Sequence, residues 1–67
     1  MLSARNQIRG RVKSVKSGQV MAEVIMAVGD IEVVSLISVE SAQKMNLKPG
    51  DEVTAVIKAT EVMVAKD

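Results

Sequence analysis

Apolar and polar residues alternate along the first half of the chain with a period of two. Residues 8–16, Ile-Arg-Gly-Arg-Val-Lys-Ser-Val-Lys, place small or apolar side chains on one face and mostly basic side chains on the other. Residues 20–28 and 31–38 are apolar on both faces near their centres, and Gly29-Asp30 separates them as a turn signal. A period of two is typical of β-strands, so we predict three consecutive strands with a hairpin between the second and the third.

The pattern changes in the second half of the chain. Residues 39–47 place apolar side chains at helical spacing, which predicts a helix of about two turns. The Pro-Gly pair that follows ends this helix and turns the chain. Residues 52–59 then predict a fourth strand, because alternate residues are apolar, and residues 61–65 predict a short fifth strand after a bend.

Three strands, a short helix and two further strands indicate a mostly β fold. This order predicts a five-stranded OB-like barrel with one short helix between strands three and four. The alternative is a small open α+β sheet. We favour the barrel, because closure removes the edges that such apolar strands would otherwise expose. The 67 residues are expected to form a single domain, residues 1–67.

The composition predicts self-association. A domain of this length buries only about 60% of the surface that its unfolded chain exposes, and such domains often rely on disulfides, metals or oligomerisation. The chain contains no cysteine and no histidine, which excludes disulfides, thiolate sites and the commonest transition-metal ligand. Since 48% of the residues are hydrophobic, we expect one strand face to fill the barrel and the other to pack on a neighbouring copy.

Charge and composition argue against two classes of partner. Nine Lys and Arg residues against eight Asp and Glu give no clear basic excess, and aromatic residues for base stacking are absent. An OB-type nucleic-acid-binding module remains an alternative, because Arg9, Arg11 and Lys13 line one strand face. No apolar run approaches the roughly 18 residues that span a membrane, and the N-terminal residues lack the apolar region of a signal peptide. We expect a cytoplasmic protein without nucleic-acid or membrane partners.

The sequence gives no positive argument for catalysis. Without His or Cys, the Ser-His-Asp and Cys-His arrangements of nucleophilic enzymes cannot be built. The eight carboxylates form no paired motif, and the four glycines are scattered singly rather than gathered in a phosphate-binding loop. We therefore predict a binding protein rather than an enzyme. A ligand-free structural oligomerisation domain remains a second alternative.

Three polar features interrupt the strand-and-turn pattern and suit an anion. Residues 3–7, Ser-Ala-Arg-Asn-Gln, precede the first strand and combine a planar guanidinium with neutral donors. Lys58 ends the fourth predicted strand. Ser41 stands near the predicted helix start, where free N–H groups carry partial positive charge. Each feature also has a plain structural explanation, as a solvated tail, a surface lysine and a helix cap.

Together these segments resemble the molbindins, the small molybdenum-pterin-binding or Mop proteins. The opening pentad and the tetrad Lys-Ala-Thr-Glu at 58–61 are the most specific parts, because Gly-x-Val and Pro-Gly-Asp occur in many β proteins. The resemblance covers essentially the whole chain, and its matching segments are residues 3–7, residues 18–24 (Gly-Gln-Val-Met-Ala-Glu-Val), residues 37–41 (Ile-Ser-Val-Glu-Ser) and residues 49–62.

The resemblance implies a fold, an assembly and a ligand. Molbindins have an OB-like fold and form homohexamers, which are trimers of dimers with strand exchange between partners. They bind molybdate, and also tungstate, at subunit interfaces. This chain looks like the stand-alone, single-domain form, for which the implied role is molybdate storage and homeostasis inside the cell. No pterin is expected, since stacking aromatics are absent.

The resemblance also assigns an oxyanion site. Side chains donate from the serine and arginine of the opening pentad and from the lysine of the closing tetrad, while the alanines donate backbone N–H groups. The implied arrangement brings Ser3, Ala4 and Arg5 of one subunit to Ser41 and Lys58 of another. No residue is expected to ligate a metal cation, because molybdenum is bound as molybdate. The implied donors are Ser3, Ala4, Arg5, Ser41, Lys58 and Ala59, and the possible supporting residues are Asn6, Gly18, Gln19 and Val20.

Overall fold

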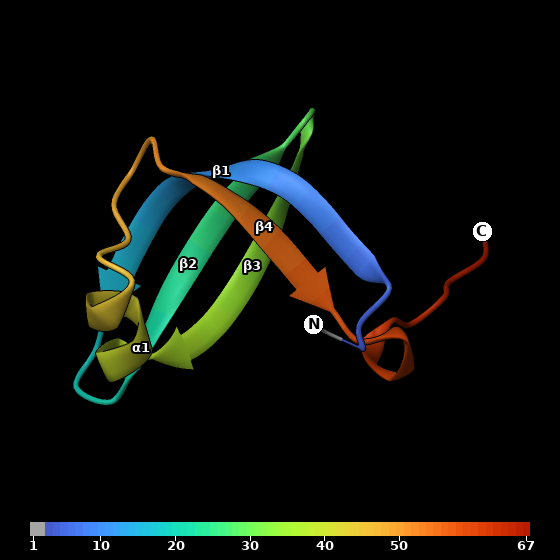
Figure 1. The fold of residues 1–67 in the computed structure, drawn as a ribbon. Helices are drawn as coiled ribbons and strands as arrows, with labels where there is room; N and C mark the ends of the chain where they lie inside the picture. The colour runs from blue at the N-terminus through green and yellow to red at the C-terminus, as the bar shows by residue number, and fades with distance from the viewer. Residues whose placement is uncertain (1–2) are drawn as a thin grey trace.

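The computed structural model describes residues 3–67 and shows a strongly curved antiparallel sheet with a short helix at one end (Figure 1). The strands follow in sheet order β3-β2-β1-β4, so β1 is an inner strand with partners on both sides. The predicted first three strands are confirmed, and the fourth is confirmed with an earlier end. The elements are β1 (Asn6–Ser17), β2 (Met21–Val28), β3 (Ile31–Ser38), α1 (Val39–Lys44) and β4 (Glu52–Ile57).

The closed five-stranded barrel predicted from the sequence is wrong for the single chain. Residues 3–67 form four strands, and β3 and β4 are the two edges of an open sheet. After β4 the chain makes a 3-10 turn, η1 (Ala59–Glu61), and then leaves the sheet (Figure 1). The predicted fifth strand at 61–65 pairs with neither edge, and Met63 and Val64 are each 93% exposed. Residues 61–65 therefore have the alternating pattern of a strand, but neither edge of the chain's own sheet pairs with them.

β1 takes part in two different ladders. Its residues 6–11 pair with β4, and its residues 11–17 pair with β2. The two ladders overlap at Arg11, and a bulge between Val12 and Ser14, just inside the part paired with β2, inserts Lys13 as an extra residue. Because a bulge bends its strand and increases the local twist, β1 can curve from one partner to the other.

The helix is shorter than the predicted 39–47 because both of its ends are fixed by specific hydrogen bonds. At the start, the Ser38 hydroxyl accepts a hydrogen bond from the Ser41 N–H at 3.0 Å, as the side chain of an N-cap serine commonly does. At the end, Asn46 adopts a left-handed φ of 51°, and the Leu47 N–H donates back to the Ala42 carbonyl at 3.2 Å. Neither α1 nor any other helix within residues 3–67 has the length and apolar character needed to cross a membrane.

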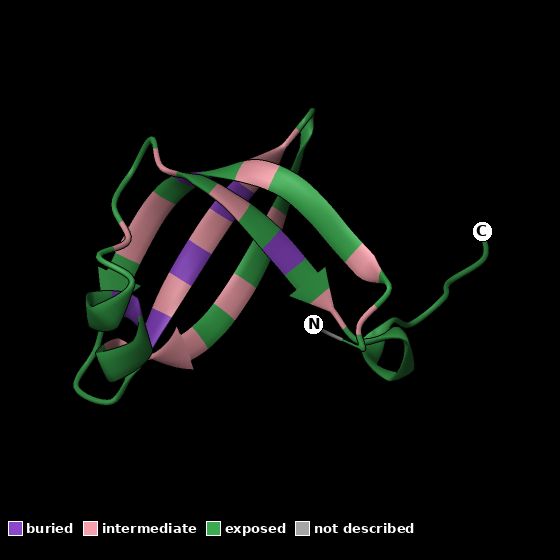
Figure 2. Ribbon diagram, in the orientation of Figure 1, coloured by how far each residue is buried: buried purple, intermediate pink, exposed green. Residues whose placement is uncertain are grey.

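The core on the inner face of the sheet is small (Figure 2). Half-buried side chains from β1, β3, β4 and the segment after α1 pack against it. Many large apolar side chains of the described residues stay exposed, and the predicted partner copies remain an expectation. The buried hydrophobic residues are Val12, Ala22, Val24, Met26, Ala42 and Ala55, so three of them are alanines.

Gly10 lies where β1 passes close to the end of β2. A Cβ atom at this position would stand 2.7 Å from the Ala27 carbonyl oxygen and 2.8 Å from Cγ2 of Val28. We expect Gly10→Ala to lower the free energy of unfolding by about 1–3 kcal/mol, because backbone must shift to admit the methyl group. Urea denaturation at fixed protein concentration measures this. Arg9→Ala, at the exposed neighbouring position, should stay within about 0.5 kcal/mol of wild type, and equal losses for both variants would contradict the close-approach explanation.

Candidate functional site

One end of the sheet brings the N-terminal segment to the end of β4. Asn6 and Ile57 form the last pair of the β1–β4 ladder. Arg5 directly precedes this pair and Lys58 directly follows it, so the two cationic residues enter the same end of the sheet from two strands (Figure 1). We call residues 3–6 together with residues 58 and 59 the cationic end.

The two basic residues of the cationic end have no acidic partner. Arg5 and Lys58 are exposed, and neither takes part in an ion pair within residues 3–67. Because their positive potentials add at one place, an approaching dianion would meet two uncompensated charges. The basic residues that are ion-paired lie elsewhere, and they are Arg9, Arg11, Lys13, Lys44 and Lys48.

Neutral donors surround these charges. Ser3 is exposed, and Ala4 and Asn6 are half-buried. The Gln7 side-chain amide donates to the Ala4 carbonyl at 2.9 Å, which folds the segment before β1 into a turn. The turn η1 has no side-chain cap, so the backbone N–H groups at its start, that of Ala59 first, receive no acceptor from a capping residue.

Ser41 lies at the opposite end of the molecule. Its hydroxyl is 2.8 Å from that of Ser38, and the Val39 N–H donates to the Val20 carbonyl at 2.8 Å. This second bond ties the β1–β2 loop to the start of α1, so the possible supporting residues 18–20 gather beside Ser41 rather than beside the cationic end. We call Ser38, Ser41 and residues 18–20 the serine end.

The two ends are too far apart to hold one small anion within a single chain. The 12 residues of β1 run from one end to the other, and the two ends lie on opposite sides of a molecule whose longest dimension is 35 Å (Figure 1). Hydrogen bonds to one oxyanion bridge only about 3 Å each. Ser41 and Lys58 can therefore share a ligand only when they come from different copies.

The sequence-predicted donors thus fall into two groups. Five of them share the cationic end, namely Ser3, Ala4, Arg5, Lys58 and Ala59, and within the chain Lys58 lies beside the N-terminal segment rather than near Ser41. Sequence reasoning missed the hydrogen bonds of Gln7 to Ala4 and of Ser38 to Ser41. Two sequence features could have indicated these bonds. Gln7 lies in the polar pentad, three residues after Ala4, and the two serines are likewise three residues apart.

The basic stripe on the outer face of β1 is largely compensated by acidic residues. Nη2 of Arg9 lies 3.1 Å from Oε2 of Glu52, and Nη2 of Arg11 lies 3.7 Å from Oε1 of the same carboxylate. Lys13 is paired with Glu32. Binding to a nucleic-acid backbone relies on clustered cations that are free to contact phosphates. A stripe with so little net charge is poorly suited to it.

Comparison with known sequences places the chain among small binding proteins. Residues 2–64 match the TOBE domain. The chain is 48% identical over 64 residues to molybdenum-pterin-binding protein 3 of Clostridium pasteurianum, and the match covers 94% of each protein.

Comparison with solved structures agrees with the sequence match. A molybdate-binding protein from Sporomusa ovata superposes with a TM-score of 0.95 at 41% identity, and the match covers 98% of both chains. The cytoplasmic molybdate-binding protein ModG, solved with molybdate bound, gives a TM-score of 0.83 at 43% identity. That match covers 88% of this chain and 43% of ModG.

Proposed function

Because the chain belongs to the TOBE-domain family and to its molybdenum-pterin-binding proteins, we propose that it binds molybdate, and also tungstate, for storage in the cytoplasm. It acts as a binder rather than an enzyme, and it holds the oxyanion without a pterin. The observation that carries the proposal is the pair of unpaired cations, Arg5 and Lys58, at one end of the sheet. The molybdate bound to ModG supports the choice of ligand.

The chemistry of the cationic end suits a tetrahedral dianion. Two positive side chains balance two negative charges, and charge-assisted hydrogen bonds are roughly twice as strong as neutral ones. The neutral donors of Ser3, Ala4 and Ala59 would satisfy the remaining oxygens, since each buried oxygen left without a partner costs about 1–3 kcal/mol. Sulfate has the same shape and charge, so selection of molybdate would rest on the size of the cavity.

A second copy completes the site in this proposal. The cationic end of one subunit meets the serine end of another, which brings Ser41 to the ligand and places Gly18, Gln19 and Val20 nearby. We propose a homohexamer, a trimer of dimers, in which every site lies between subunits. Oxyanion binding then stabilises the assembly, because the ligand binds the associated state and not the separate chains.

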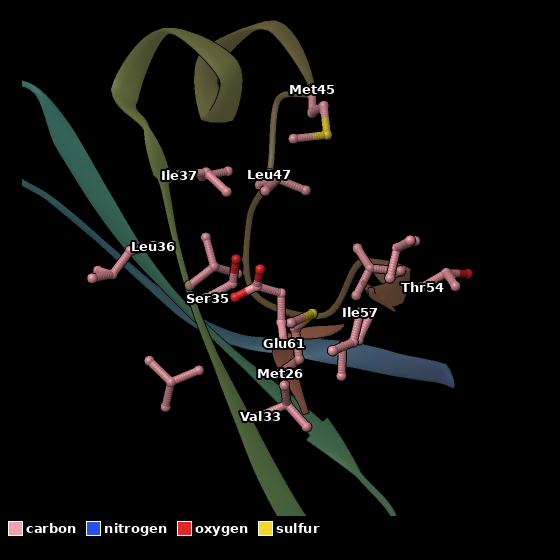
Figure 3. A pocket seen from close by; sticks show the side chains of 15 residues that line it. Met26, Val33, Ser35, Leu36, Ile37, Met45, Leu47, Thr54, Ile57 and Glu61 are labelled. Carbon is pink, nitrogen blue, oxygen red and sulfur yellow. The ribbon is translucent and has the colours of Figure 1, made fainter. Parts of the chain in front are cut away.

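The open side of the sheet supports exchange of the C-terminal segment between copies. A groove of about 620 Å³ runs between the edges β3 and β4 (Figure 3). Its walls are mainly apolar, with Met26, Val33, Leu47 and Ile57 among the lining side chains. Residues 62–65 are apolar and exposed in their own chain, so the same segment of a partner copy fits the groove as its missing fifth strand.

Native mass spectrometry of the protein titrated with molybdate tests the function, with sulfate at equal concentration as the control. We expect a hexamer that gains discrete molybdate masses and takes up no sulfate. A hexamer that binds neither anion would leave a structural oligomerisation role. A mass gain with a single-stranded oligonucleotide that disappears at high salt would favour the nucleic-acid alternative.

A further inference from the structure

The donors that precede β1 lie outside the sheet ladders. β1 begins at Asn6, and the pair of Asn6 with Ile57 is the last of the β1–β4 ladder. Residues 3–5 come before this pair, and both Ser3 and Arg5 are exposed. Fixing such a segment in one arrangement costs conformational entropy for every residue in it. Unless another part of the chain holds residues 3–5 in place, an oxyanion that they bind has to order them on binding.

The side chain of Gln7 tethers this segment. Its Nε2 donates to the Ala4 carbonyl oxygen at 2.9 Å, across three residues of the chain. Among residues 3–67, it is the one hydrogen bond outside the strands and helices that reaches residues 3–5. Ala4 is half-buried between two exposed neighbours. Figure 1 shows the chain turning sharply before β1 and passing beside η1.

Gln7 is itself held by the sheet. It pairs with Val56 of β4, one position inside the end of the ladder. Its backbone therefore belongs to the regular part of the molecule, while its side chain reaches back to the irregular part. A site becomes well ordered when residues on rigid elements support the loop that carries its donors, and Gln7 stands in this relation to residues 3–5.

The bond to the Ala4 carbonyl also sets the direction of a backbone donor. This carbonyl and the Arg5 N–H belong to the same peptide group, and in a planar trans peptide the two point in opposite directions. No cis peptide bond occurs in the described residues. Because Nε2 of Gln7 lies on the carbonyl side, the Arg5 N–H points away from Gln7. The tether thus fixes both this N–H and the position from which the Arg5 side chain extends.

The amide of Gln7 is suited to this task because it donates without adding charge. Gln7→Glu would keep the length of the side chain but remove the donor, since an ionised carboxylate only accepts hydrogen bonds. It would also place a negative charge two residues from Arg5. A neutral donor at position 7 therefore holds the segment and leaves the positive potential of the cationic end intact.

We propose that Gln7 is a positioning residue for the oxyanion site, which holds residues 3–5 in their binding arrangement before the anion arrives. Gln7 acts through that segment and does not contact the ligand. The proposal rests on the proposed function and adds a residue outside its set of donors. Preorganisation of this kind raises affinity by removing an ordering cost from binding rather than by adding a contact.

The test measures the molybdate Kd of the full chain by isothermal titration calorimetry. We expect Gln7→Ala to raise the Kd about fivefold, and Gln7→Glu to raise it further. The matched control is Gln43→Ala, because Gln43 is an exposed glutamine of α1 whose side chain makes no hydrogen bond within residues 3–67. This control should keep the wild-type Kd. The urea denaturation midpoint of Gln7→Ala should stay at the wild-type value, since Gln7 is exposed.

The same substitution in an Arg5→Ala background separates positioning from general support of the fold. If Gln7 acts through Arg5, adding Gln7→Ala to Arg5→Ala should change the Kd less than about twofold, because the segment no longer carries the charge that the tether positions. An equal factor in both backgrounds would overturn the inference, since it would show that Gln7 does not act through Arg5.

Two further outcomes separate the inference from the function on which it rests. If Gln7→Ala binds molybdate with the wild-type Kd, Gln7 is not a positioning residue and the proposed function stands. If the wild-type chain itself binds no molybdate, both the inference and the proposed function are wrong.

Discussion

We expect Arg5→Ala to weaken molybdate binding by about 100-fold and to leave the fold intact. Arg5 is one of only two cations at the cationic end, and within the described residues it has no ion pair to lose. Truncating one partner of a buried, hydrogen-bonded charge pair costs about 2–5 kcal/mol, and about 1.4 kcal/mol corresponds to a tenfold change in Kd. Isothermal titration calorimetry with molybdate measures the change directly.

Two matched variants separate the role of Arg5 from a general loss of charge. Arg9→Ala also removes an arginine side chain, but one that lies within β1 and is paired with Glu52. It should change the Kd less than about threefold. Arg5→Lys keeps the charge but loses the planar fork of donors, so its Kd should fall between those of wild type and Arg5→Ala. An unchanged Kd for Arg5→Ala would show that the oxyanion site lies elsewhere.

We expect the deletion of residues 62–67 to abolish the proposed assembly and to lower molybdate binding below detection. The four strands end at Ile57 and the small core contains no residue beyond position 55, so the shortened chain keeps its sheet. Its groove, however, no longer finds a partner segment, and its sites lose the second copy. Analytical ultracentrifugation gives the mass, and the same calorimetric titration gives the affinity.

The control for this deletion keeps the segment and changes only one of its two charged residues, Lys66. Lys66→Ala leaves the apolar run at 62–65 in place and should assemble and bind as wild type does. Val64→Asp introduces a charge into that run and should reproduce the deletion, because a buried carboxylate without a partner is costly. If the deleted chain still assembles at the wild-type mass, the groove has another occupant or none.

Local patterns along the chain predicted most of the fold. The period-two segments predicted the first three strands well, because each strand pairs with its neighbour in sequence and little else competes. The fourth strand followed from the alternation of Val53, Ala55 and Ile57, although it ends before the predicted residue 59. The helix was predicted too long, because a left-handed Asn46 is one of several possible C-terminal stops and the apolar spacing continues to Leu47.

The fifth strand and the distribution of the site depend on long-range geometry that local patterns do not contain. An apolar, alternating segment such as 62–65 indicates a strand, but not whether the edge it joins belongs to its own chain. Similarly, the polar pentad and Lys58 were recognisable as anion donors, and their proximity follows only from the pairing of Asn6 with Ile57. The separation of Ser41 from both became visible only once the direction of β1 was known.

The double pairing of β1 sets the order in which a newly made chain can fold. β1, β2 and β3 follow one another in sequence, so this meander can form once residue 38 has left the ribosome, while the first half of β1 must wait for residues 52–57. Closing that long loop is the slow, high-contact-order step. Until it occurs, residues 6–10 carry an unpaired strand edge beside apolar surface, the feature that makes folding intermediates prone to aggregate. Each chain is therefore most prone to aggregate in the interval between formation of the β1–β2–β3 meander and the pairing of β4 with the first half of β1.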